Sequence, residues 1–250
     1  MPLLMMNSYV MTNEQKRMLK SFKNSITEEG IEQLPDDDLL RFLTGFRWDT
    51  ARAFDVYKRE REWFHRVRPD LIQPSTLKPE VLSGLVYFFD PPILDSHSNL
   101  VVFIDAAKFN KKETSEERLT PLVLWLVEET MRRFTRPDQK LSLVVSMKNL
   151  KWKKFYDRHS FSHVATMLSE FYCERMGDTY VVDPPPLFKM GWTFIRGFLE
   201  KHTCDKIHVV SSKELLQFFE VDDLPKAFGG MHPDFDKNTF SNTIGLDQSS

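Results

Sequence analysis

The sequence has little glycine, few cysteines, almost no net charge and no long apolar run. Its nine glycines form no phosphate-cradling loop of the kind that nucleotide-binding enzymes use. Cys173 and Cys204, the two cysteines, lack the spacing of a metal site, and we expect both to be reduced thiols. A net charge of -2 gives no indication of nucleic-acid binding.

The apolar content instead indicates a globular protein with a substantial core. Apolar residues make up 41% of the chain, and 21 of its residues are phenylalanine. No stretch is long and apolar enough to predict a transmembrane helix, so any membrane contact is expected to be peripheral. The opening MPLLMMNSYVMTNEQ has no basic flank and no clear cleavage site, which predicts no signal peptide and a cytoplasmic location.

The first part of the chain predicts a small helical domain over residues 10–70. Thr12 and Gln15 have the spacing of a capping box, and Leu19, Phe22 and Ile26 then fall on one helical face. The acidic run in PDDDLLRFL suits the positive end of a second helix. A third helix is predicted from about residue 49 to the proline at 69.

Strands alternate with helices over residues 78–236. This alternation predicts an α/β domain with a mixed, mainly parallel sheet of five strands. The strands are GLVYFFD, NLVVFIDA, KLSLVVSM, DTYVVD and KIHVVS; the helices are TPLVLWLVEETMRRF with a proline in its first turn, FYDRHSFSHVATMLSEFYCERM, LFKMGWTFIRGFLE and KELLQFF. The polar tail over residues 237–250 is expected to be flexible.

Three consecutive prolines, Pro184 to Pro186, end the fourth strand and begin a helix that runs to Leu199. Proline has no N–H donor and therefore cannot continue a central strand. The helix is apolar on more than one face, which fits either a helix buried on two sides or a lid between an apolar ligand and a membrane. Its candidate cavity and lid residues are Leu187, Phe188, Met190, Trp192, Phe194, Ile195 and Phe198.

Polar residues on either side of this helix offer groups that suit a phosphorylated polyol. Glu174 precedes the strand, and Thr203, Asp205 and Lys206 follow the helix. Cations and hydroxyl donors suit a phosphate, and carboxylates accept hydrogen bonds from ring hydroxyls. Each residue also has an ordinary structural interpretation: a helix cap, a turn residue, a solvated strand end or half of a surface ion pair.

Four segments in order resemble the CRAL-TRIO lipid-binding family. They are DLLRFLTGFRWD, FYCERMGDTYVVDPPPLF, FLEKHTCDKIHVVSS and LPKAFGG, and they span roughly residues 36 to 231. Within the family they are most similar to the phosphatidylinositol transfer proteins. The resemblance implies a small helical domain, then a mixed α/β domain whose lipid cavity lies between the sheet and a movable gate helix.

The resemblance also implies roles for particular residues. Glu174, Thr203, Asp205 and Lys206 match positions that contact the inositol phosphate, and Arg47 matches a basic position near the headgroup. The helix after the prolines matches the gate. The implied ligand is phosphatidylinositol, bound in place of any cofactor.

Two positions depart from the family pattern. Phe46 stands where members often carry a second basic residue. Members that also bind phosphatidylcholine carry small hydroxyl residues on the third strand, whereas this chain presents Leu141, Leu143 and Val145. We therefore expect weak or absent binding of phosphatidylcholine.

The predicted function is to bind phosphatidylinositol and to transfer or present it at membranes. The alternative is the same scaffold with another ligand, such as a sterol, a tocopherol-like molecule or haem, or with a protein partner. An enzyme is disfavoured, because the chain has no G-x-S-x-G elbow and no metal triad. Expected partners are the phospholipid, a transient membrane surface and lipid kinases, with no nucleic acid, and we expect a monomer.

Two further signals have open interpretations. KWKKFY combines cations with a tryptophan, as a membrane-docking patch or a solvated loop would. His159 and His163 are four residues apart on a predicted helix, but HSFSH lacks the glutamate of a zinc hydrolase motif. Two surface histidines are the preferred interpretation.

Overall fold

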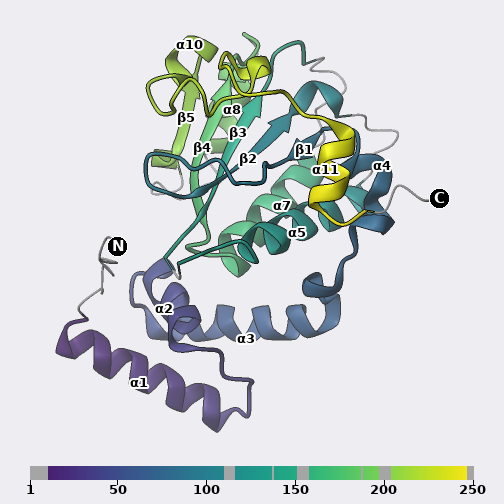
Figure 1. The fold of residues 1–250 in the computed structure, drawn as a ribbon. Helices are drawn as coiled ribbons and strands as arrows, with labels where there is room; N and C mark the ends of the chain where they lie inside the picture. Colours follow the sequence, from purple (N-terminus) through teal and green to yellow (C-terminus); the bar gives the residue numbers. More distant parts are fainter. Residues whose placement is uncertain are drawn as a thin grey trace, which may run out of the picture. The chain divides into compact units, whose positions relative to one another are not determined.

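A computed structural model describes residues 11–109, 116–136, 138–150, 158–186, 188–196 and 204–246. The chain divides into two compact units. The helical unit contains the chain up to Val67 together with Ser169–Glu174, and the sheet unit contains Arg68–Leu168 and the chain from Arg175 onward. Figure 1 shows the elements of each unit.

The helical unit is built from α1 (Asn13–Glu28), α2 (Asp36–Gly45) and α3 (Thr50–Val67). The predicted capping box is confirmed: the Thr12 hydroxyl accepts a hydrogen bond from the Gln15 N–H, and the Gln15 side chain bonds back to Thr12. The apolar faces of the three helices meet in one core, which contains Leu19, Phe22, Ile26, Leu39, Phe42, Leu43, Ala53, Val56, Tyr57 and Cys173.

A buried ion cluster lies beside this core. Glu60 and Arg61 of α3 are only 3% and 6% exposed, and the Arg61 guanidinium donates two hydrogen bonds of 2.6 Å to the Glu60 carboxylate. Nη2 of Arg41 lies 3.8 Å from the same carboxylate. Since charges out of water must be paired, this cluster makes the stability of the unit depend on Glu60.

The sheet unit contains a five-stranded sheet in the order β1-β2-β3-β4-β5. Only β1 is antiparallel to its neighbour, so the predicted mixed, mainly parallel sheet is confirmed. The strands are β1 (Val86–Tyr87), β2 (Leu100–Asp105), β3 (Leu141–Ser146), β4 (Met176–Val182) and β5 (Ile207–Val210).

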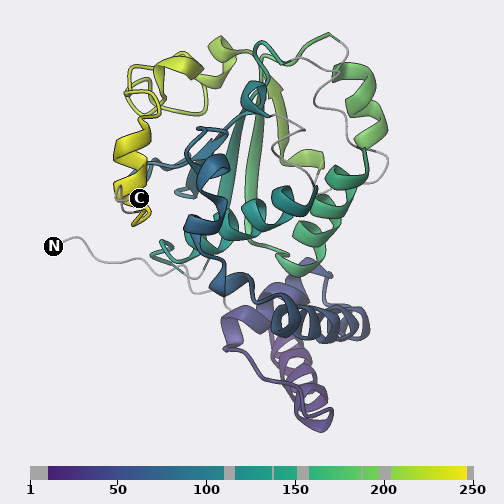
Figure 2. The ribbon, with the colours of Figure 1, turned by 90° about the vertical axis from the view of Figure 1, so that its right-hand side faces the viewer.

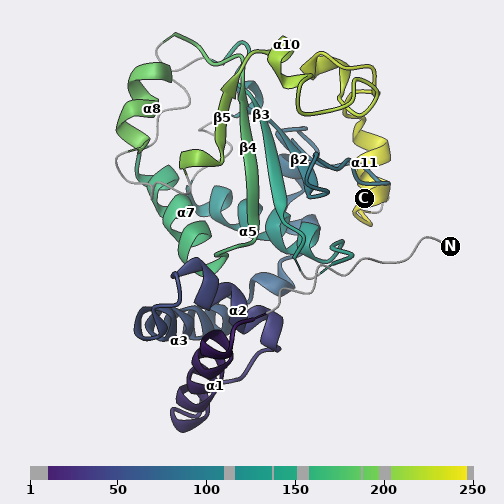
Figure 3. The same ribbon diagram turned by 90° about the vertical axis from the view of Figure 1, so that its left-hand side faces the viewer.

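The strand order determines which side of the sheet the connecting helices cover. Strands β2 to β5 follow one another without reversal, so right-handed crossovers bring all their helices to one side. These helices are α5 (Glu116–Met131), α7 (Arg158–Phe171) and α8 (Phe188–Arg196). Figures 2 and 3 show α7 and α8 on that side, with the carboxyl-terminal segment on the other.

The other helices of the sheet unit that the structure describes are short. They are η1 (Pro69–Leu71), η2 (Pro74–Leu77), α4 (Lys78–Val81), η3 (Ala106–Lys108), α10 (Ser212–Leu215), η4 (Lys226–Phe228) and α11 (Lys237–Thr243). Among the described residues, no helix is both long and apolar enough to cross a membrane.

The first strand and the long helix after β2 differ from the sequence prediction. Only Val86 and Tyr87 of GLVYFFD pair, because Pro91 and Pro92 follow closely and offer no N–H donors. Pro121 lies inside α5 rather than in its first turn. The helix begins further upstream at Glu116, where the Arg118 side chain pairs with Glu80.

The tail is also more ordered than the sequence suggested. Asp236 caps α11 by accepting a hydrogen bond of 2.8 Å from the Thr239 N–H. Phe240 is 4% exposed and packs against Phe88 at 5.3 Å between ring centroids, and Leu246 is 6% exposed. The expectation of a flexible tail from residue 237 is therefore wrong through Leu246, since two buried apolar side chains hold this segment.

Candidate functional site

The sheet face beneath α8 carries two rows of mostly β-branched side chains. Residues paired directly across neighbouring strands lie on the same face. Phe188 of α8 packs in one cluster with Val181 and Ile207, which identifies their face as the one beneath α8. We call it the α8-side face; its rows are Leu143, Thr179 and Ile207, then Val145, Val181 and Val209.

The α8-side face is incompletely covered by protein. Val209 is 41% exposed, and Leu143, Val145, Thr179 and Ile207 are half-buried. On the opposite face of the same strands, Val144 and Tyr180 are 0% and 1% exposed. An apolar surface left partly open beside an apolar helix is a place where an apolar ligand would be removed from water.

The helix over this face is anchored at its start. The Phe188 N–H donates a hydrogen bond of 2.8 Å to the Pro185 carbonyl, so the prolines lead directly into α8 as predicted. Phe188 is 4% exposed, and its ring stacks on that of Trp192 at 6.1 Å. Leu187 and Phe198 lie outside the described residues, as do the side chains of Met190, Phe194 and Ile195.

The hydroxyl groups of β3 point away from the α8-side face. The Ser142 hydroxyl donates a hydrogen bond of 2.6 Å to Asp95, and Ser146, four residues further along the strand, lies on the same face as Ser142. Leu141, Leu143 and Val145 occupy the side toward α8. The register therefore agrees with the sequence interpretation that β3 offers no hydroxyl donor there.

Two of the predicted headgroup residues lie at the start of β5. The Lys206 side chain is half-buried, and its ammonium donates a hydrogen bond of 3.3 Å to the Met176 carbonyl at the start of β4. The Thr179 N–H donates to the Lys206 carbonyl at 2.8 Å. Asp205 is exposed beside it. The backbone around Lys206 is thus held in place by β4. The Lys206 ammonium lies at the amino-terminal end of β4.

Two other predicted residues, Glu174 and Arg47, belong to the helical unit. Both have left-handed backbone conformations, with φ of 58° and 55°. A Cβ added to Gly45 would lie 3.8 Å from the Glu174 side chain, so Glu174 packs against the end of α2. Gly45, the last residue of α2, is two residues before Arg47 in the sequence. Beside it, burial raises the pKa of the Cys173 thiol to about 11, which keeps the thiol protonated at neutral pH.

Several predicted features lie outside the described residues. They are Thr203, the KWKKFY segment over residues 151–156, and the side chains of His159 and His163. The described residues do form a pocket of about 220 Å3, but on the side of the sheet opposite α8. It is lined by Tyr87, Asp105, Lys108, Ser146, Ala227, Phe228, Asp234 and Phe235.

The sequence did not identify the residues of β4 and β5 that form the α8-side face. Thr179 and Val181 of β4, and Ile207 and Val209 of β5, were identified only as strand residues. The alternation within DTYVVD and KIHVVS was the available signal, but it does not say which face is covered.

Comparison with known proteins agrees with this geometry. Residues 83–230, which include all five strands and α8, match the CRAL/TRIO domain. The chain belongs to the CRAL/TRIO family. Membership of this lipid-binding family makes the protein a lipid carrier rather than an enzyme.

The similar CRAL/TRIO proteins include two fungal Sec14 cytosolic factors. The Candida glabrata protein is 25% identical over 236 residues, which cover 86% of this chain and 78% of the relative. The Schizosaccharomyces pombe protein is 25% identical over 238 residues, which cover 88% and 83%. The crystal structure of Sfh5 has a TM-score of 0.66 at 15% identity, covering 82% of this chain and 83% of that chain, and supports the fold alone.

Proposed function

We propose that this CRAL/TRIO protein binds phosphatidylinositol in an apolar cavity and transfers or presents it at membranes. The observation that carries the proposal is the incompletely covered α8-side face. Its partly exposed residues run from β3 to the edge strand β5, where Val209 is 41% exposed, and they would be stabilised by an apolar ligand that excludes water. Two acyl chains are a chemical match for such a surface.

Burial of the acyl chains also requires a movable gate in the protein. Burial stabilises a lipid by about 0.8 kcal/mol per methylene, so a two-chain lipid cannot leave into bulk water on a useful timescale. Exchange must take place at a bilayer, and some element must open there. Such a carrier works in the cytoplasm, associates with membranes peripherally as a monomer, and supplies lipid to enzymes such as lipid kinases.

The helix α8 is the proposed gate. It lies over the α8-side face, and Phe188 and Trp192 contact the cluster that contains Val181 and Ile207. Amide hydrogen exchange in α8 is expected to increase when phospholipid vesicles are added, because outward movement exposes its backbone. Identical protection of α8 with and without vesicles would contradict the gate.

The headgroup assignment centres on the start of β5. Lys206 presents an ammonium and Asp205 a carboxylate, with Thr203 as the proposed hydroxyl donor. Glu174 and Arg47 are proposed on the sequence motifs alone. These groups match the hydroxyls and the phosphate of an inositol phospholipid. A sterol or a tocopherol-like ligand has no phosphate and too few hydroxyls to pair with them.

The test is a transfer assay combined with lipid identification. Native mass spectrometry of the purified protein is expected to find one phosphatidylinositol per chain, and the protein is expected to move phosphatidylinositol between vesicles. Phosphatidylcholine is expected to move much more slowly, because Leu143 and Val145 offer its headgroup no donor. Transfer of sterol without phosphatidylinositol would overturn the ligand assignment, and comparable transfer of both phospholipids would overturn the role given to β3.

A further inference from the structure

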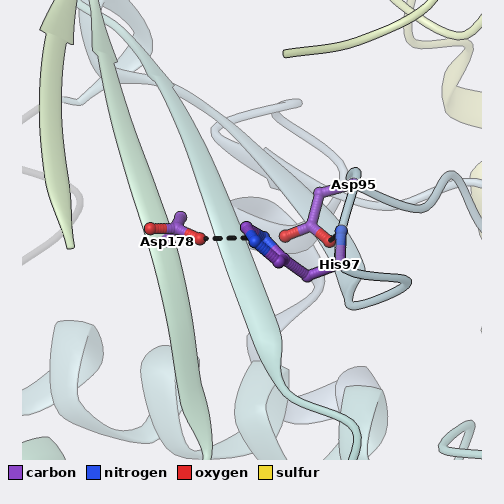
Figure 4. A group of neighbouring side chains, drawn as sticks. All are labelled: Asp95, His97 and Asp178. Atoms are coloured by element: carbon purple, nitrogen blue, oxygen red, sulfur yellow. Dashed lines mark hydrogen bonds and ion pairs between the residues drawn. The ribbon is translucent and has the colours of Figure 1, made fainter.

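Two histidines meet one carboxylate on the sheet face that is turned away from α8. Nε2 of His208 on β5 lies 2.8 Å from Oδ1 of Asp178 on β4. Nδ1 of His97, in the turn before β2, lies 3.4 Å from Oδ2 of the same carboxylate. Figure 4 shows the His97 ring reaching toward Asp178, with Asp95 beside it. Side chains from three separate segments of the chain thus meet at the Asp178 carboxylate.

The turn that carries His97 is held firmly. The Asp95 carboxylate accepts hydrogen bonds from the His97 and Asn99 N–H groups, from the Asn99 amide and from the Ser142 hydroxyl. These four bonds use the acceptor capacity of both oxygens. Asp95 is only 6% exposed and therefore positions the turn rather than serving as a free ligand.

Asp178 and His208 are also fixed. The Asp178 N–H donates a hydrogen bond of 3.1 Å to the Ser142 hydroxyl, and a Cβ at the neighbouring Gly177 would lie 2.4 Å from that oxygen. The His208 ring stacks on Tyr180 at 5.1 Å and packs against Phe218 at 5.4 Å. The His97 side chain is 68% exposed, so it is the one member with freedom to adjust.

We propose that His97, Asp178 and His208 bind one divalent transition-metal ion of the Zn2+ or Cu2+ class. Imidazole nitrogen and carboxylate oxygen are the ligands that these ions use in proteins. Donor atoms of Asp95, His97 and Asp178 lie within 4.8 Å of one another, and His208 meets Asp178 from the other side at 2.8 Å. Each imidazole faces a different oxygen of Asp178, so an ion held by both oxygens would take one nitrogen from each side, with the exposed His97 side chain adjusting to complete the set.

Metal binding would replace the hydrogen bond between His208 and Asp178, and it would link the turn before β2 to β4 and β5. A plain cluster of hydrogen-bonded side chains is the competing interpretation. The helical unit offers a matched comparison: Nε2 of His65 lies 3.2 Å from the Glu32 carboxylate, with no second histidine facing that carboxylate among the described residues.

The experiment is isothermal titration of the untagged, full-length protein with Zn2+ and with Cu2+. Wild type is expected to bind one ion. His97→Gln and His208→Gln are each expected to weaken binding at least about tenfold, because even outer-shell partners of a metal contribute that much. Asp178→Asn is expected to abolish saturable binding. His65→Gln is the control and is expected to bind as wild type does.

Two further readouts keep the test independent of folding. Unfolding curves without metal report whether each variant is folded, and His97→Gln is the safest variant because its side chain is exposed. The electron paramagnetic resonance spectrum of Cu2+ is expected to show two nitrogen ligands in wild type and one in His97→Gln. No saturable binding by wild type, or equal binding by wild type and a folded His97→Gln, would overturn the proposal.

Discussion

Replacement of Lys206 by alanine is expected to reduce phosphatidylinositol transfer steeply while leaving the protein folded. The proposed contact to the lipid phosphate is a charge-assisted hydrogen bond, worth about 1.5–3 kcal/mol. Its loss corresponds to roughly a ten- to hundredfold decrease in affinity for the headgroup. The measurement is the rate of phosphatidylinositol transfer between vesicles, alongside thermal unfolding of the lipid-free protein.

The structure also defines the competing role of Lys206. Its ammonium donates to the Met176 carbonyl, so the variant will lose about 1 kcal/mol of stability even if it never contacts lipid. Lys206→Met preserves the packing of the side chain and should show the same transfer defect as Lys206→Ala. Lys213→Ala removes an exposed cation from α10 and should transfer normally. Wild-type transfer by both Lys206 variants would leave Lys206 as a strand-end contact only.

Glu60→Ala is expected to cause the largest loss of stability. The substitution leaves the buried Arg61 guanidinium without the carboxylate to which it donates two hydrogen bonds, and it leaves Arg41 without the same neighbour. Removing one partner of a buried ion pair typically costs about 3–5 kcal/mol, and we expect the lower end of this range because Arg61 keeps a hydrogen bond of 3.4 Å to Glu32. Urea unfolding followed by circular dichroism should show this loss as an early transition of the helical unit.

The control for this prediction lies on the same helix. Lys58 pairs with Glu29 at 2.8 Å, but the two side chains are 44% and 49% exposed. Water and ions screen an exposed pair, so Lys58→Ala should unfold almost as wild type does. Equal effects of the two substitutions would show that burial of the Glu60 cluster has no energetic consequence.

Patterns of neighbouring residues in the sequence were sufficient to predict most of the helices and strands. The capping box at Thr12 and the spacing of Leu19, Phe22 and Ile26 predicted α1, because a helix start and an amphipathic face depend on residues within a few turns. The strands β2 to β5 were predicted because a short apolar, β-branched run is also a local pattern. The polar composition of the tail gave the wrong expectation for this segment, since burial of Phe240 and Leu246 outweighs several polar neighbours.

By itself, the sequence determined the order of strands and helices, the prolines that lead into α8, and the identity of the candidate headgroup residues. Only the tertiary structure decided which face of the sheet lies under α8 and that Val209 there is partly open. It alone brought His97, Asp178 and His208 together. The physical reason is that strand alternation assigns side chains to two faces without saying which is covered, and sheet pairing joins residues that are distant in the chain.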